Sequence, residues 1–470
     1  MLARGGDSHA SATGAGGGDT SRSASDWANA AERSQCNIAL IVAGLRDERL
    51  SNQNEVDVSE LSQFRPVPRT GVIYVMTEAA KRGFRYGHPD WVNLGQGAPE
   101  TGVLPGSAPR IESLSIDPAA HEYGPVDGIS ELKEAVASLY NARYRKGMRS
   151  QYTPENVSIS PGGRAGLTRV AAALGHLHLG HLLPDYTAYE ELLDLFRNFV
   201  PIPIVLRPED GYRLSAERLR ESIVGMGLGA LLFSNPTNPT GNVVRGDELS
   251  RWIGIGRKLS CAFVIDEFYA HYVYGEGGPA SAAHYVEDVD SDPVVILDGL
   301  TKNWRYPGWR LSWTLGPKEV IRRIASAGSF LDGGASHPIQ RGALPLLEHA
   351  AADREAAAIC AAFSKKRDLM VKRLPALGMT LEDTPGGAFY AFPSLKDLPE
   401  PLRDGMTFFE KALEHKVICV PGSFFDIDPG KFRGHLPSRL TSTVRLSFGP
   451  DEASVGKGLD RLGAMIGSVR

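Results

Sequence analysis

Three stretches of the sequence decide the fold, and each is an apolar run that ends in polar residues: ALLFSNPTNPTG (230–241), AFVIDEFY (262–269) and PVVILDGLTK (293–302). Each apolar run has the length of a strand and lacks the alternation typical of a sheet with one face in water. The runs therefore predict parallel strands that are buried on both faces. Because ligands bind at the carboxyl ends of such strands, we expect the polar residues to share one crevice.

Amphipathic helices are predicted around these strands, which makes the chain an α/β protein with a mostly parallel central sheet flanked by helices. One helix is expected to begin at Ser130, which we interpret as its capping residue. Another is expected at the C-terminus. Both have apolar side chains at helical spacing, in the first at Leu132, Val136, Leu139 and Tyr140, and in the second at Val455, Leu459, Leu462 and Ile466.

The composition is that of an ordinary globular protein. The 470 residues are 42% hydrophobic and 23% charged, and the net charge of −4 favours neither nucleic acid nor an anionic membrane as a partner. The apolar stretch 36–45 is about half of the ~20 residues that span a bilayer. Four scattered cysteines indicate reduced thiols, so a cytoplasmic enzyme is the leading class.

The N-terminal segment differs from the rest of the chain. Residues 1–25 are almost entirely small and polar, which predicts disorder, and a short helical stretch is expected over 26–45. The triplet Gly16-Gly17-Gly18 lacks the Lys-Ser/Thr ending of a nucleotide-binding loop and is better explained as a linker.

The polar residues at the strand ends suit one ligand, pyridoxal phosphate. Lys302 could form a Schiff base with its aldehyde if the amine is held neutral. A carboxylate in a low-dielectric pocket would keep the ring nitrogen protonated, and Asp266 suits that task. Tyr269 and Asn238 suit the negatively charged 3-oxygen of the ring. The sequence therefore predicts a cofactor site with Lys302, Asp266 and Tyr269 as its catalytic residues.

A glycine turn is the candidate site for the cofactor phosphate. The sequence SPGGRAG (160–166) follows an alternating strand pattern and precedes a helical run at 167–174. A strand, a glycine turn and a helix N-terminus direct backbone N–H groups at an anion. Arg164 and Arg310 would add charge-assisted hydrogen bonds.

These motifs resemble the class I/II aminotransferases of fold type I, the aspartate-aminotransferase-like superfamily of pyridoxal-phosphate enzymes. The resemblance extends from about Val92 to the C-terminus, and it is strongest at NPTNPTG (235–241), DEFY (266–269) and TK (301–302) through PGWR (307–310). The order and spacing of these motifs are highly specific.

The resemblance implies a large domain and a smaller α+β domain built from both ends of the chain. Residues 1–65 would form the disordered or helical extension, and 66–120 the N-terminal part of the small domain with its connection. Residues 121–345 would form the large cofactor-binding domain, and 346–470 the C-terminal part of the small domain.

The resemblance also implies roles for single residues. Lys302 resembles the Schiff-base lysine that moves a proton between the substrate α-carbon and cofactor atom C4′. Asp266 resembles the partner of the pyridine nitrogen, and Asn238 and Tyr269 resemble the ligands of the 3-oxygen. The phosphate site would be made by Gly163, Arg164, Ala165 and Arg310.

Further positions match substrate-binding and subunit-contact residues of the family. Tyr186 falls where the family stacks an aromatic ring on the cofactor. Arg445 is similar to the arginine that binds the substrate α-carboxylate, with Gly97 and Asn238 beside it. Tyr123 resembles a tyrosine that reaches the phosphate in the neighbouring subunit, so the family implies a homodimer with shared active sites.

The chain also departs from the family pattern. His176, His178 and His181 lie where relatives have a short acidic turn, and they invite a metal interpretation, although no Cys or carboxylate cluster adjoins them and a structural role is favoured. Gly299 stands where some relatives carry a phosphate-binding serine. Trp304 and Arg305 follow the lysine, and the sequence assigns them no role.

The function predicted from these residues is transfer of an amino group between an L-amino acid and a 2-oxo acid by a ping-pong mechanism. The cofactor motifs are shared by other reactions, so β-elimination, decarboxylation and amino-acid oxidation stay open. A ligand-sensing regulator would need a DNA-binding module, and residues 1–65 are too short and Gly/Ser-rich for a persuasive one.

Overall fold

The computed structural model describes residues 67, 69 and 71–469. The described fold is that of the compact unit Arg69–Arg470. The disorder predicted for residues 1–25 and the helix predicted for 26–45 lie outside the described residues.

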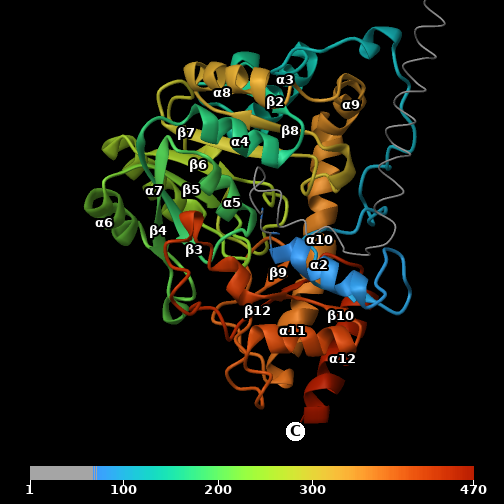
Figure 1. The fold of residues 1–470 in the computed structure, drawn as a ribbon. Helices are drawn as coiled ribbons and strands as arrows, with labels where there is room; N and C mark the ends of the chain where they lie inside the picture. The colour runs from blue at the N-terminus through green and yellow to red at the C-terminus, as the bar shows by residue number, and fades with distance from the viewer. Residues whose placement is uncertain (1–66, 68, 70, 470) are drawn as a thin grey trace, which may run out of the picture. The chain divides into compact units, whose positions relative to one another are not determined.

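The described helices and strands alternate over most of the chain (Figure 1). The α-helices are α2 (Gly71–Lys81), α3 (Ser130–Tyr144), α4 (Gly163–Ala173), α5 (Ala188–Leu195), α6 (Ala216–Met226), α7 (Gly246–Leu259), α8 (Lys318–Leu331), α9 (His337–Ala343), α10 (His349–Arg373), α11 (Gly405–Glu414) and α12 (Glu452–Val469). The strands are β1 (Val92–Asn93), β2 (Val157–Ser160), β3 (Leu177–Leu183), β4 (Phe199–Val205), β5 (Leu228–Ser234), β6 (Ala262–Asp266), β7 (Val294–Gly299), β8 (Ser312–Leu315), β9 (Tyr390–Ala391), β10 (Val417–Ile418), β11 (Val420–Pro421) and β12 (Val444–Ser447).

The largest sheet has seven strands in the order β2-β8-β7-β6-β5-β3-β4. Strand β8 runs antiparallel to both of its neighbours, and the other pairs are parallel. The three apolar runs of the sequence are β5, β6 and β7, which lie side by side at the centre. The prediction of a mostly parallel sheet is confirmed.

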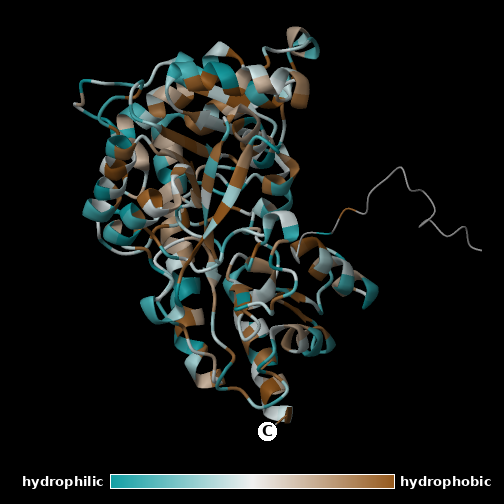
Figure 2. Ribbon diagram, turned by 60° about the vertical axis from the view of Figure 1, so that its left-hand side comes forward, coloured by the Kyte–Doolittle hydropathy of each residue, from teal (hydrophilic) through white to brown (hydrophobic). Residues whose placement is uncertain are grey.

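Both faces of this sheet are covered, because successive side chains of a strand point to opposite faces. In β5, Leu231 and Phe233 join one buried cluster with residues of α3, α6 and α7, whereas Ala230 and Leu232 join a second cluster with residues of α4, α5 and α8. Figure 2 shows apolar residues gathered on the strands and hydrophilic ones on the outward faces of the helices. Two-sided burial explains why the runs are apolar throughout.

The segments from the two ends of the described chain pair with each other. Strand β1 is parallel to β10, and β11, β12 and β9 form a small antiparallel sheet. Helix α2 contacts β10 and β11. The segment that precedes the large sheet therefore packs with the segment that follows it.

Most predicted helices are confirmed, with one correction at a helix start. Helix α12 buries the four predicted apolar residues, and α4 includes nearly all of the predicted run, although it begins earlier, at Gly163. Helix α3 has Ile129 as its N-cap, and Ser130 is already helical. The prediction of Ser130 as the capping residue is wrong, because the extended backbone that precedes a helix falls one residue earlier.

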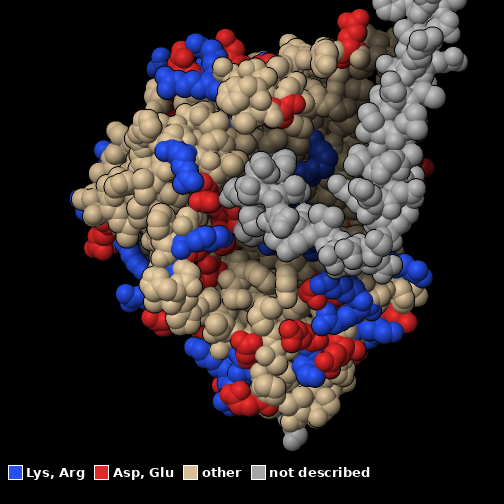
Figure 3. All heavy atoms as spheres, viewed as in Figure 1, with Lys and Arg blue, Asp and Glu red and all other residues tan. Residues whose placement is uncertain are grey.

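The cysteines of the described part are free thiols, and the face in Figure 3 carries charges of both signs. Within the described residues, no helix is long and apolar enough to cross a membrane. Cys261, Cys360 and Cys419 are free thiols, as predicted, and Cys36 lies outside the described part. On the face seen in Figure 3, basic and acidic side chains are interspersed.

Candidate active site

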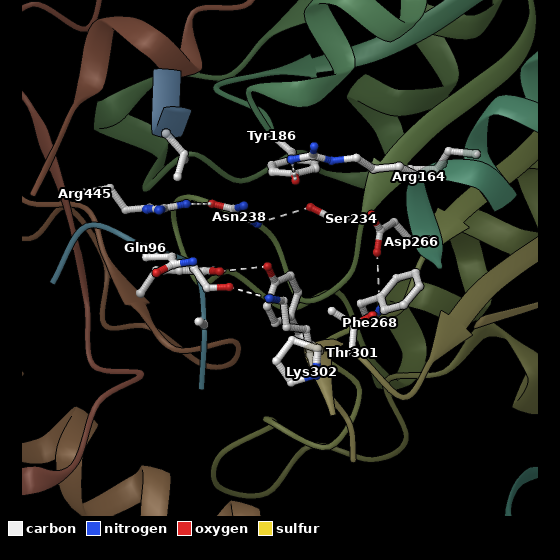
Figure 4. A pocket seen from close by; sticks show the side chains of 18 of the residues that line it. Gln96, Arg164, Tyr186, Ser234, Asn238, Asp266, Phe268, Thr301, Lys302 and Arg445 are labelled. Atoms are coloured by element: carbon white, nitrogen blue, oxygen red, sulfur yellow. Dashed lines mark hydrogen bonds between the residues drawn. The ribbon is translucent and has the colours of Figure 1, made fainter. Parts of the chain in front are cut away.

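A cavity of about 450 Å³ lies at the carboxyl ends of β5, β6 and β7. Polar residues that follow each of these strands line it, as the sequence predicts, and they point toward one another in Figure 4. The predicted site residues that it brings together are Gly97, Gly163, Arg164, Tyr186, Asn238, Asp266, Tyr269, Lys302, Arg310 and Arg445. Ala165 and Tyr123 do not line it.

The Lys302 amine is aimed into the cavity and donates a hydrogen bond to the carbonyl of Gly97 (Figure 4). Its pKa is lowered to about 7, first because protein atoms displace water from the amine and then because Arg310, Arg445 and Arg164 repel its charge. Near pH 7 a large share of the amine is therefore neutral, the form that attacks an aldehyde.

This lowered pKa predicts the pH dependence of cofactor capture by the cofactor-free protein. The rate of visible absorbance appearing with pyridoxal phosphate should rise with pH to about 7 to 8 and then level off. An ordinary lysine, with a pKa of about 10.4, would continue to gain rate up to that pH. N-acetyl-lysine methylamide is the control for titration of the cofactor itself. A protein rate that climbs in parallel with this amine up to pH 10 would contradict the lowered pKa.

Asp266 ends β6 with its carboxylate buried at the cavity. The Tyr189 hydroxyl of α5 donates to Oδ2 at 2.9 Å, and the backbone N–H of Phe268 donates to Oδ1 at 3.3 Å. Burial raises the pKa of Asp266 to about 6, and these two donors and the charge of Lys302 oppose the rise. A positively charged group beside this carboxylate would be strongly favoured.

The glycine turn before α4 is shaped for an anion. Gly162, the N-cap residue, has a φ of 96°, a conformation that favours glycine. A Cβ there would fall on the guanidinium of Arg310, and one at Gly163 would fall on the ring of Phe268. The helix N-terminus and the Arg310 side chain therefore meet at one end of the cavity, where both favour a phosphate.

The backbone of Arg164 belongs to the glycine turn, but its side chain points toward Tyr186. It lies in the first turn of α4, but Nη2 donates to the hydroxyl of Tyr186 at 3.1 Å. Figure 4 shows its guanidinium beside the Tyr186 ring, away from the turn. Ala165 contributes to the same helical turn through its backbone only. The charge of Arg164 is thus available to a ligand in the cavity.

Arg445 and Asn238 meet on the opposite side of the cavity. Arg445, on β12, donates from Nη1 to Asn238 Oδ1 at 2.8 Å and from Nη2 to the carbonyl of Gly95 at 2.5 Å. Its Nε is buried with no hydrogen-bond partner among the described residues. A guanidinium held in this way has used two of its five N–H donors, and Nε–H is among those still free for a carboxylate.

Tyr269 and Gly97 share one neighbour, the tyrosine at the start of β9. The hydroxyls of Tyr269 and Tyr390 lie 2.8 Å apart, and a Cβ at Gly97 would fall on the Tyr390 hydroxyl. Glycine at position 97 therefore allows the loop to pass close to both phenols. Sequence reasoning did not identify Tyr390, since it lies 88 positions after Lys302 with no motif around it.

The residues that depart from the family pattern have structural explanations. A Cβ at Gly299 would fall on the backbone of Leu311 and Ser312, so β8 leaves no room for a serine there. The segment with the three histidines is largely β3, and His181 is buried within it. No group of three His, Cys, Asp or Glu side chains suited to a metal ion occurs among the described residues.

Other residues in or beside the cavity were not identified from the sequence. Tyr189 binds Asp266, Phe268 packs on the glycine turn, and Val72 and Ile73 of α2 form part of the wall. Phe268 lies inside the motif 266–269, which was the available sign of it, whereas no motif surrounds Tyr189, Val72 or Ile73.

The cavity fits pyridoxal phosphate at each of its reactive parts. A partly neutral amine, a buried carboxylate and an anion-binding turn surround one space, and the Thr301 hydroxyl, like Arg445 Nε, is buried there without a partner among the described residues. The fold and these groups define a pyridoxal-phosphate enzyme of fold type I. The model of the family described as "Aminotransferase class I and II" matches residues 89–462, and the chain belongs to that family.

Individual relatives are aminotransferases as well. Aspartate aminotransferase from Streptomyces avermitilis is 29% identical over 377 residues, 77% of this chain and 85% of the relative. Aspartate/prephenate aminotransferase from Thermus thermophilus is 30% identical over 351 residues, 74% of this chain and 83% of the relative. The solved structure of Thermus thermophilus aspartate aminotransferase with maleate has a TM-score of 0.69 and 25% identity, and the match covers 88% of this chain and 100% of that one. The protein is a pyridoxal-phosphate-dependent aminotransferase that acts on amino acids and 2-oxo acids.

Proposed function

We propose that this aminotransferase prefers a dicarboxylic L-amino acid as its donor and that Arg164 binds the second carboxylate. The observation that carries the proposal is the Arg164 side chain, which lines the cavity and contacts Tyr186 rather than the glycine turn. Arg445 and Arg310 already account for one carboxylate and the phosphate, so Arg164 is an additional cation. Relatives named for aspartate and for aspartate/prephenate support this substrate class.

We propose the following roles for the cavity residues. Bound pyridoxal phosphate supplies the electron sink that weakens bonds at the amino acid α-carbon. Asp266 holds the proton on the ring nitrogen, while Tyr269 and Asn238 donate to the 3-oxygen. Lys302 would hold the cofactor aldehyde through its amine, and once the donor's amino group had displaced it from that bond, the freed amine would accept the proton from the α-carbon of the donor. The donor would leave as a 2-oxo acid, with its oxygen supplied by water and its amino group retained at the site, and a second 2-oxo acid would take up that amino group by the reverse route.

Substrate and phosphate are bound by residues at opposite ends of the cavity. Arg445 binds the α-carboxylate, with Asn238 and Gly97 beside it. The backbone of Gly163, Arg164 and Ala165, together with Arg310, binds the phosphate, and the Tyr186 ring stacks on the cofactor. This arrangement leaves the space between Arg164 and the wall of α2 for the substrate side chain.

Replacing Arg164 by leucine tests the proposed donor. We expect kcat/KM for L-aspartate to fall about 10- to 100-fold, because a charge-assisted bond to a carboxylate is lost, whereas kcat/KM for L-alanine changes less than about 3-fold. Steady-state assays with 2-oxoglutarate measure both. Arg164→Lys should retain part of the preference, and Tyr186→Phe controls for loss of the hydroxyl contact. Equal losses for both donors, with weaker cofactor retention, would place the guanidinium on the phosphate instead.

We also propose a homodimer in which Tyr123 reaches the partner's active site. Tyr123 is fully exposed within the described unit, as expected of a side chain that meets another subunit. Light scattering should give about twice the chain mass of 50.7 kDa. A mass of one chain in active enzyme would reject the dimer.

The location and the division into domains are proposals too. The free thiols of the described cysteines support a cytoplasmic location, and cell fractionation with an activity assay tests it. Pairing of β1 with β10 supports a small domain built from 66–120 and 346–470 around the large domain 121–345, behind an extension at 1–65. Limited proteolysis should therefore cut near these boundaries.

A further inference from the structure

The buried arginine three positions after Lys302 joins the segment that carries Lys302 to the loop that holds its amine. Arg305 is 0% exposed and lies outside the cavity wall. We propose that Arg305 is a positioning residue, which fixes the loop 95–102 so that its carbonyls hold Lys302 and Arg445 in place. This inference rests on the function proposed for Lys302.

Hydrogen bonds of Arg305 connect the backbone of Lys302 to the loop 95–102. Its backbone N–H donates to the carbonyl of Lys302 at 2.9 Å. Its Nη1 donates to the carbonyls of Glu100 and Gly102 at 3.1 and 2.5 Å. The same loop presents the Gly97 carbonyl to the Lys302 amine. The lysine is therefore held at its backbone and at its amine by segments that Arg305 connects.

The loop 95–102 also determines the position of the Arg445 guanidinium. The carbonyl of Gly95 accepts from Arg445 Nη2 at 2.5 Å. Because Gly95 and Gly97 belong to one short segment, a shift of the loop would move the acceptors of Lys302 and Arg445 together. Arg305 thereby influences both groups without contacting the substrate.

Helix α10 fixes the guanidinium from the other side. Glu355, which is 3% exposed, accepts from Arg305 Nε at 2.8 Å. Lys366 of the same helix donates to Glu100 Oε1 at 2.5 Å. A buried ion pair by itself is weak evidence for a stabilising role, since an apolar pair packs as well. The two loop carbonyls explain why residue 305 is an arginine, because one guanidinium group can donate to both carbonyls and to Glu355 at the same time.

Loosening the loop would change the environment of the Lys302 amine. The charged groups that act on this amine are Arg310, Arg445, Arg164 and Asp266, and burial is the largest single cause of its lowered pKa. If the loop moves, water enters and solvates the ammonium ion, so the amine should titrate at higher pH. A structural arginine elsewhere in the chain would have no such effect.

The test measures the amine in cofactor-free protein, independently of catalysis. Acetic anhydride labelling of the Lys302 peptide, followed by mass spectrometry across pH, gives the titration midpoint of the amine. In Arg305→Met we expect the midpoint to rise by about one pH unit. We also expect kcat of the loaded enzyme to fall about 10-fold or more, as a misplaced catalytic group would cause.

Two further variants separate positioning from stability. Arg145 is also fully buried and donates to the carbonyls of Ser150, Ala283 and Val286, so Arg145→Met should lower Tm without moving the midpoint. Arg305→Met/Glu355→Leu removes both charges of this pair, but Arg110, 3.5 Å from Glu355, loses its carboxylate too, so the double variant should regain only part of the Tm lost in Arg305→Met and keep the raised midpoint.

Two sets of results would overturn the inference. An unchanged midpoint in both Arg305 variants, or an equal rise in Arg145→Met, would show that Arg305 only stabilises the fold. A wild-type midpoint near 10 would instead contradict the role proposed for Lys302. The outcomes for Arg305 and for the proposed function are thus distinguishable.

Discussion

Replacing Lys302 by alanine is expected to lower kcat at least about 10⁴-fold, the upper range for loss of a positioned acid or base. The variant loses the covalent bond to the cofactor and also the group that moves the α-proton. The amine of Lys302 in the wild type suits both tasks because it is partly neutral near pH 7 and can therefore attack an aldehyde and accept a proton. Steady-state assays and the visible spectrum of the purified variant measure the two losses.

The matched control for this variant is Lys258→Ala. Lys258 is exposed in the last turn of α7, so its removal should leave both the spectrum and kcat unchanged. The Lys302→Ala variant keeps the glycine turn, Arg310 and Asp266, so pyridoxal phosphate should still bind to it reversibly. A Lys302→Ala protein with wild-type turnover and spectrum would refute the proposed site as a whole.

The central sheet was predictable because its signal is local. Strands β5, β6 and β7 are buried on both faces, so each had to be an uninterrupted apolar run, and the polar residues after them had to gather at one edge. The N-cap of α3 was misassigned by one residue, since both Ile129 and Ser130 can adopt the extended backbone before a helix and local sequence does not choose between them.

Site residues were predictable where a motif surrounds them and not elsewhere. Lys302, Asp266 and Asn238 lie at or shortly after the carboxyl ends of strands, whereas Tyr390 reaches the cavity from a short strand that is distant in the sequence. Tyr390 is aromatic and buried, like many residues of the core, so nothing in its neighbours marks it. Arg305 illustrates the same limit, since its role depends on Glu100 and Glu355, which only the fold brings to it.

Replacing Asp266 by asparagine is expected to lower kcat about 10³-fold, within the range for acid–base catalysis. The amide keeps the shape of the carboxylate but not its charge, so it cannot hold the proton on the ring nitrogen. The pH dependence should change as well. In the cofactor-free wild type the pKa of Asp266 is about 6, so the carboxylate becomes neutral as pH falls through 6 and cofactor affinity should weaken there.

Comparing the two proteins isolates this titration, because the cofactor phosphate titrates equally in both. The ratio of wild-type to Asp266→Asn affinity, measured by equilibrium dialysis, should be large at pH 8 and should shrink toward one below pH 6. Tyr189→Phe removes one donor to Asp266 but keeps its charge, so its kcat should fall about 10-fold or less. If Asp266→Asn loses no more than Tyr189→Phe, the carboxylate charge is not what the reaction needs, and Asp266 merely fills a buried position.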